Sequence, residues 1–64
     1  MREGLALLLV NMLASEFGYK FEWLTDPAER DAAVFRLVNP GHDSREFSGQ
    51  DKFEQAVEWL REKA

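Results

Sequence analysis

The sequence predicts a two-layer α+β domain in which a helix, two or three short antiparallel strands and a second helix follow one another. Three observations support this fold class. Apolar residues recur with helical spacing near the amino terminus, aromatic and polar residues alternate in the middle, and helical spacing returns near the carboxyl terminus. The chain of 64 residues is expected to form one domain, residues 1–64, with both helices on one face of a small sheet.

The first predicted helix spans residues 4–17 and is apolar around more than half of its circumference. Gly18 follows at the usual place of a left-handed C-terminal cap. This apolar surface exceeds what one neighbouring layer covers, so we expect part of it to contact another molecule. We assign that part to Leu7, Val10 and Ala14, which lie at one-turn spacings. The alternative is that the second helix covers these three side chains.

Two predicted strands follow, over residues 19–25 and residues 32–39. The first alternates aromatic and polar side chains, which is typical of a half-buried strand. Pairing the strands as a hairpin places Glu22 opposite Arg36 on the outer face, where opposite charges attract. The same register makes two inner pairs, Phe21 with Leu37 and Trp23 with Phe35.

The connections are polar and contain the remaining turn signals. Residues 26–29 indicate a loop with a short turn. Residues 39–42 carry proline and glycine at the central positions of a type II turn. Residues 43–47 are a candidate third strand, in which Phe47 is the only clear core residue.

The second predicted helix starts after Ser48–Asp51, which resembles a capping box, and runs to about Lys63. Its core stripe has the spacing i, i+3, i+4, i+7 and consists of Phe53, Ala56, Val57 and Leu60. Trp59 lies on the flank of this stripe, one turn before Lys63, whose ammonium can cover the indole face. We expect Trp59 either at the edge of the core or as the anchor of a protein interface.

Carboxylates gather on one side of the second helix, at Asp51, Glu54, Glu58 and Glu62. A solvated helix face explains this strip most simply, because the repulsion between like charges one turn apart is small. The sharper alternative is a recognition strip for a basic partner, or an imitation of a nucleic-acid backbone.

Composition excludes several classes of function. The absence of cysteine rules out disulfides and thiolate metal sites and agrees with a reducing cytoplasm. Twelve acidic and eight basic residues give a net charge of −4, which opposes binding to phosphate backbones and anionic membranes. The apolar run over residues 5–10 is too short to span a membrane, and its flanks do not fit a cleavable leader.

No residue pattern predicts catalysis. His42 is the single histidine, and its neighbours Asp43 and Ser44 are adjacent in sequence, whereas a catalytic triad needs groups that converge from separate elements. The four glycines match no phosphate-binding signature. We therefore expect no metal, no cofactor and no enzymatic activity.

The order of elements resembles that of double-stranded RNA-binding domains, which grip phosphates with a lysine-rich start to their last helix. Here that position holds a single base, Lys52, so the resemblance is one of topology and carries no function by itself. We expect a small acidic protein-interaction module that forms a homodimer through its first helix. The alternatives are an acidic inhibitor of a nucleic-acid-processing protein and a double-stranded-RNA-binding-like domain.

Overall fold

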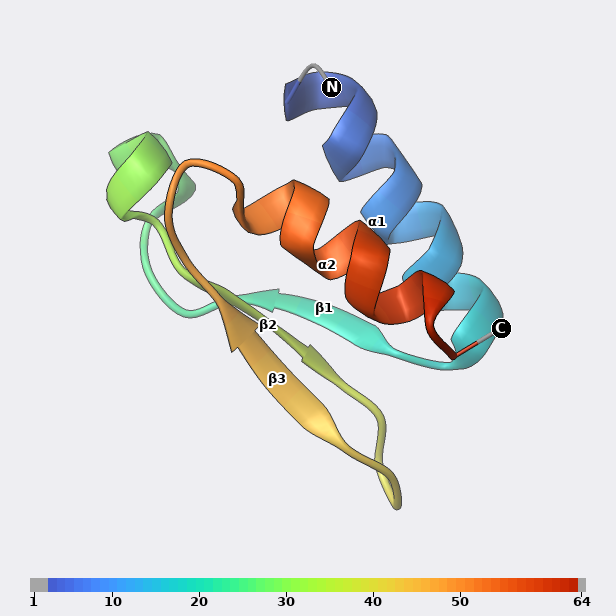
Figure 1. Cartoon of the computed structure of the whole chain (residues 1–64). Coiled ribbons are helices and arrows are strands. Elements are labelled where there is room, and N and C mark those ends of the chain that lie inside the picture. The colour runs from blue at the N-terminus through green and yellow to red at the C-terminus, as the bar shows by residue number, and fades with distance from the viewer. Residues whose placement is uncertain (1–2, 64) are drawn as a thin grey trace.

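The computed structural model describes residues 3–63 and has the predicted α+β architecture (Figure 1). The elements, in chain order, are α1 (Glu3–Phe17), β1 (Lys20–Trp23), the 3₁₀ helix η1 (Pro27–Ala32), β2 (Phe35–Val38), β3 (Ser44–Phe47) and α2 (Lys52–Arg61). The strands form one antiparallel sheet in the order β1-β2-β3, so the candidate third strand is present. The helices pack against each other on the aromatic face of the sheet, where α1 contacts β1 and α2 contacts β3.

The hairpin register agrees with the prediction. Glu22 pairs with Arg36, Phe21 with Leu37, and Trp23 with Phe35. On the outer face the Arg36 guanidinium donates hydrogen bonds to the Glu22 carboxylate, one of them from Nε at 2.8 Å. The alternation of aromatic and polar residues therefore specified the pairing, because a slip of one residue would turn every aromatic ring into solvent.

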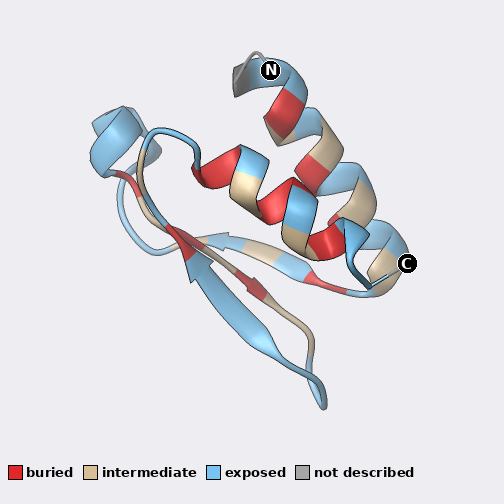
Figure 2. Ribbon diagram, viewed as in Figure 1, coloured by how far each residue is buried: buried red, intermediate tan, exposed pale blue. Residues whose placement is uncertain are grey.

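Phe35 forms the centre of the core. Its ring is fully buried and lies parallel to three other phenylalanine rings, with centroid distances of 4.6 Å to Phe21, 5.3 Å to Phe47 and 5.2 Å to Phe53. The predicted stripe of α2 completes this core, and all four of its residues are buried (Figure 2). The side chains that line the core thus come from both helices and all three strands.

Two of the predicted turns have the expected geometry. Gly18 ends α1 in the left-handed region with φ 82°, and the amide of Tyr19 donates to the Ala14 carbonyl at 2.7 Å. Gly41 adopts φ 86° in the turn after β2, which the His42 amide closes by donating to the carbonyl of Asn39 at 2.9 Å. A side chain at either glycine would be forced into a conformation that L residues rarely adopt.

The connection between β1 and β2 is more ordered than the sequence indicates. Asp26 caps η1, and its carboxylate accepts a hydrogen bond from the Ala28 amide at 2.9 Å. The helix extends as far as Ala32, which the sequence places in a strand, and it kinks at Arg30, where φ is 54° and ψ is −110°. No residue type in this segment marks the kink, since arginine has no preference for positive φ.

The predicted capping box at the start of α2 is wrong. The residue at the N-cap position is Asp51, and its side chain makes no capping hydrogen bond. The Asp51 carboxylate instead accepts from the Gln55 side chain at 2.6 Å. The helix starts later than the Ser48 prediction because Gly49, with φ 96°, turns the chain first.

Candidate interaction surfaces

The structure overturns the predicted contact patch on α1. Val10 is fully buried and Ala14 is 2% exposed, and both belong to the core of the monomer. Leu7 is half-buried and packs against the same core. These side chains lie on the side of α1 that faces the rest of the molecule, so the alternative of internal cover is the correct one.

The apolar surplus of α1 is real, but it lies on the opposite side of the helix. Leu5, Leu8 and Met12 are 52%, 55% and 59% exposed. Their spacing of three and then four residues aligns them in one row along the helix. We call these three residues the α1 strip. In Figure 2, exposed and buried segments alternate along α1.

The α1 strip has one charged neighbour, because residues 4–15 contain no acidic or basic side chain and the exposed Glu16 lies one turn after Met12. The exposed neighbours of the strip are Gly4, Asn11, Ser15 and Glu16. Asn11 turns its amide back onto its own helix, where it donates to the carbonyl of Leu7 at 3.1 Å. The outer side of α1 is therefore uncharged from residue 4 to residue 15 and has a carboxylate, Glu16, near its carboxyl end.

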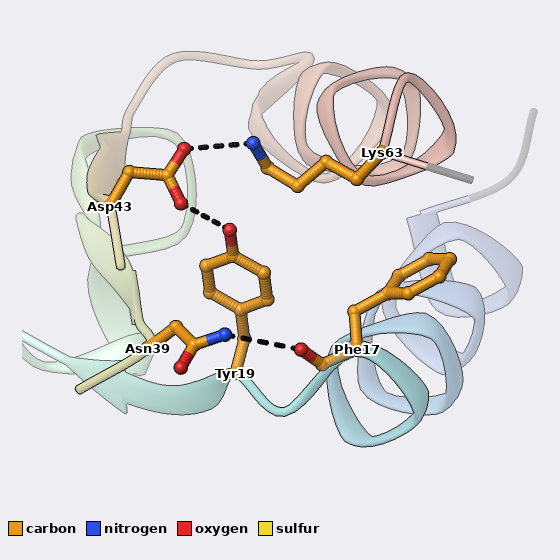
Figure 3. Close-up of polar contacts among 5 residues, drawn as sticks. All are labelled: Phe17, Tyr19, Asn39, Asp43 and Lys63. Atoms are coloured by element: carbon orange, nitrogen blue, oxygen red, sulfur yellow. Dashed lines mark hydrogen bonds and ion pairs between the residues drawn. The ribbon is translucent and has the colours of Figure 1, made fainter. Parts of the chain in front are cut away.

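A second cluster joins the carboxyl end of α2 to the turn after β2 (Figure 3). The Tyr19 hydroxyl donates to the Asp43 carboxylate, and Lys63 Nζ donates to its other oxygen at 2.8 Å. Lys63 also lies over the indole of Trp59, 4.3 Å from the ring centroid, as the sequence predicts. Nearby, the Asn39 side-chain amide donates to the Phe17 carbonyl at 3.2 Å.

The ionisation of this cluster favours the folded state at neutral pH. Hydrogen bonds from Lys63 and Tyr19 lower the pKa of Asp43 from 3.8 to about 2. Burial and the neighbouring Asp43 carboxylate raise the pKa of Tyr19 above 10.0, and the hydrogen bond to Asp43 raises the pKa of Lys63 above 10.5. The three groups are thus a carboxylate, a neutral phenol and an ammonium. Their hydrogen bonds connect the carboxyl end of the chain, the start of β1 and the turn after β2.

Trp59 is part of the same cluster. It is half-buried, and its ring makes edge contacts with Tyr19 at 5.1 Å and Phe47 at 5.7 Å between centroids. These intramolecular contacts place Trp59 at the edge of the core, the simpler of its two expected positions. Sequence analysis missed the Tyr19–Asp43 contact, because it joins residues 24 apart and no local pattern links them.

Lys52, the one base at the start of α2, is 2% exposed. Its Nζ donates to the carbonyl of Arg30 at 2.8 Å and lies 3.4 Å from the carbonyl of Gly49. The ammonium therefore makes its contacts inside the fold and is not exposed to a phosphate backbone. This position removes the feature through which a double-stranded RNA-binding domain would grip its ligand.

The predicted acidic strip lies on one exposed side of α2. Its four residues, Asp51, Glu54, Glu58 and Glu62, are all exposed. Arg61 lies among them and shares an open hollow with Glu58 and Glu62. A base inside the strip lowers its net negative charge, and the recognition of a basic partner by this strip stays a prediction.

The described part of the chain contains no cluster of metal-binding side chains and no helix that could cross a membrane. His42 is in an exposed turn. Within residues 3–63, no three His, Cys, Asp or Glu side chains gather closely enough to hold a metal ion. Neither α1 nor α2, the two α-helices in that range, has the length and apolar character to cross a membrane.

Comparisons with protein-family models, with curated proteins and with solved structures give no match to this chain. The surfaces described above differ in exposure and in charge. Of these surfaces, the α1 strip exposes the most large apolar side chains to water.

Proposed function

We propose that this chain is a small, cytoplasmic, non-enzymatic protein-interaction module that forms a homodimer through the α1 strip. One observation carries the proposal: Leu5, Leu8 and Met12 lie in one row, and each is more than half exposed. Removing apolar surface from water stabilises a contact by about 25 cal/mol for each Å² that is covered. Contiguous exposed apolar patches of this kind mark interaction sites in soluble proteins.

The charge distribution favours a second copy of the chain as the partner. The strip and the rest of residues 4–15 are uncharged, and Glu16 follows one turn after Met12. A charged partner gains nothing there, whereas an equal apolar strip matches it in chemistry and length. Two copies related by a two-fold axis bring such a patch against itself. They also repel each other through their net charge of −4, and residues 4–15 of α1 add no charge to the contact.

The small size of the domain also favours association with a second copy. A chain of 64 residues without cysteine has only a marginal core and no disulfide to support it. Small domains of this kind gain stability from a metal, from dense apolar packing or from association. Association through α1 covers side chains that the monomer leaves in water.

The test is the solution mass of the wild-type protein and of Leu8→Lys, measured by sedimentation equilibrium from micromolar to millimolar concentration. We expect the wild type to form a dimer within this range. Leu8→Lys places two charges in the centre of the contact, so we expect a folded monomer with unchanged far-ultraviolet circular dichroism.

The matched control is Leu24→Lys, because Leu24 is a large apolar residue, 40% exposed, that lies outside α1. This variant is expected to dimerise like the wild type. A wild-type protein that stays monomeric at millimolar concentration would contradict the proposal, as would a Leu8→Lys variant that dimerises as strongly as the control.

A further inference from the structure

We infer that the free edge of β1 binds an extended segment of a partner protein, which joins the sheet as a fourth, antiparallel strand. The segment has a basic, an apolar and an acidic residue in succession. β1 lies at one edge of the sheet, because the strand order is β1-β2-β3 (Figure 1). The main-chain groups of an edge strand are a template for pairing with another chain. The inference goes beyond the proposed homodimer and does not rest on it, because β1 shares no residue with the α1 strip.

The pairing of β1 with β2 shows which main-chain groups of β1 point away from the sheet. Leu24, directly after β1, donates its amide hydrogen to the carbonyl of Val34 at 2.8 Å, and the two residues are opposite each other in the register. Hydrogen-bonded pairs alternate with pairs that are not hydrogen-bonded along an antiparallel ladder. The amide and carbonyl groups of Phe21 and Trp23 therefore point outward. Within residues 3–63 no other segment donates to them or accepts from them.

The aromatic core is incompletely covered along the same edge. Phe21 and Trp23 are half-buried, whereas Phe47, in the strand at the opposite edge of the sheet, is 1% exposed. The two half-buried rings meet edge to face, with 5.3 Å between their centroids. An added strand covers the exposed parts of these rings when its side chain opposite Phe21 is apolar. An apolar residue therefore occupies the middle position of the partner segment.

The charges on the outer face of β1 determine the two flanking residues of the partner. Lys20 and Glu22 are both exposed, and Lys20 has no ion-pair partner within residues 3–63. Both hydrogen bonds from Arg36 end on Oε1 of Glu22, so Oε2 is available to a second cation. Opposite charges on facing positions of an antiparallel pair attract. The partner thus has a basic residue opposite Glu22 and, two residues later, an acidic residue opposite Lys20.

The free edge of β3 is less suited to an added strand. Arg45 lies on the inner face of β3, with its guanidinium carbon 5.2 Å from the centroid of the Phe47 ring. A strand added beside β3 would take this charge out of water without supplying an ion-pair partner from its apolar side. The two edges of the sheet therefore differ, and the apolar one is β1.

A second copy of the chain is the competing occupant, because β1 itself has the order basic, aromatic, acidic in Lys20, Phe21 and Glu22. Two copies repel each other through their net charge of −4. Each β1 also has only four residues between the end of α1 and η1. A segment of another protein has neither restriction, so we assign the edge to such a segment.

The probe is the blocked peptide Thr-Val-Lys-Ile-Glu-Val-Thr, and its matched control has the charges exchanged, Thr-Val-Glu-Ile-Lys-Val-Thr. Each is added to the isotope-labelled wild-type protein, and amide resonances and amide hydrogen exchange are followed by nuclear magnetic resonance. We expect the first peptide to shift the amide resonances of Phe21 and Trp23 and to slow their exchange. We expect the control peptide to bind about threefold more weakly or worse, because like charges then face each other.

Charge reversal on the protein tests the register. Lys20→Glu leaves the contact between Glu22 and Arg36 intact, so we expect it to fold. This variant should prefer the peptide Thr-Val-Lys-Ile-Lys-Val-Thr, whereas the wild type prefers the peptide that ends its charged pair with glutamate. Arg45→Glu, on β3, is the control on the protein and should bind all three peptides as the wild type does.

Three outcomes would overturn the inference. The first is an absence of shifts at Phe21 and Trp23 at millimolar peptide, and the second is a peptide preference that Lys20→Glu does not change. The third is slow exchange of these two amides without peptide, increasing with protein concentration and retained in Leu8→Lys, which would assign the edge to a second copy. The homodimer through α1 is tested separately, by the solution mass without peptide.

Discussion

Lys52 shows how much a single residue can depend on distant parts of the chain. The sequence presents it as the one base at the start of a helix, yet its ammonium is buried against the carbonyl of Arg30, 22 residues earlier. Arg30 has a positive φ that costs free energy, and the hydrogen bond from Lys52 helps to hold this conformation. The contact exists only because η1 folds back onto the start of α2.

Replacing Lys52 by methionine keeps most of the aliphatic side chain and removes the donor. We expect Lys52→Met to lower the free energy of unfolding by about 1–3 kcal/mol, because the Arg30 carbonyl loses its charged donor and keeps only the hydrogen bond from the Ala33 amide. Urea denaturation followed by tryptophan fluorescence measures the change. Lys20→Met, at an exposed position on β1, is the control and should change stability little. Equal effects of the two substitutions would show that the buried hydrogen bond contributes nothing.

The cluster around Asp43 predicts how stability depends on pH. The folded pKa of Asp43, about 2, lies below its ordinary value of 3.8. Its contribution is therefore present above about pH 4 and is lost as the pH falls toward 2. The raised pKa values of Tyr19 and Lys63 act at the other end, where stability is lost as the pH rises above about 10.

Urea midpoints measured between pH 2 and pH 7 test the acid side. The wild type should be more stable than Asp43→Asn at pH 7, and the difference should shrink steadily below about pH 4. A difference that stays constant down to pH 2 would mean that the ionised form of Asp43 is not what stabilises the fold.

At the scale of an element, α1 is a helix with two apolar sides that have different roles. Val10 and Ala14 face the core, whereas Leu5, Leu8 and Met12 face outward. Because α1 is apolar on both sides, its sequence does not indicate which side faces the core. The predicted contact patch therefore fell on the wrong side. The core stripe of α2 was predicted correctly, because polar residues on its opposite side define one apolar direction.

The two sides of α1 should respond differently to an added charge. Val10→Glu places a carboxylate in the core with no partner, which costs more than a small domain can tolerate, so we expect the chain to unfold. Asn11→Glu, one residue further along on the exposed side, should stay folded. Circular dichroism and the dispersion of amide proton resonances distinguish these outcomes. A folded Val10→Glu variant would show that the interior side of α1 has been assigned wrongly.

At the scale of the whole molecule, dimerisation should couple to stability. A partner that binds only the folded state raises the melting temperature with concentration. We therefore expect the melting temperature of the wild type to rise between micromolar and millimolar protein, and that of Leu8→Lys to stay constant. Differential scanning calorimetry at several concentrations makes the comparison. A wild-type melting temperature that is independent of concentration would speak against a dimer in the folded state.

Local patterns in the sequence determined the order of elements, the hairpin register and the core stripe of α2. Each of these depends on residues close together in the chain or on the two-residue period of a strand, so the side chains themselves carry the information. Glycines at the end of α1 and in the turn after β2 are predictable for the same reason, because few other residues adopt a positive φ.

Only the tertiary structure decided which side of α1 remains exposed, where the ammonium of Lys52 goes and which residues meet at Asp43. These features arise where segments 20 or more residues apart come into contact. Their geometry depends on how the helices lie on the sheet and on the kink at Arg30. Neither the packing of the helices on the sheet nor the kink at Arg30 follows from the spacing of residues within one element. The sequence of α1 is apolar on both sides, so only packing decides which side faces the core.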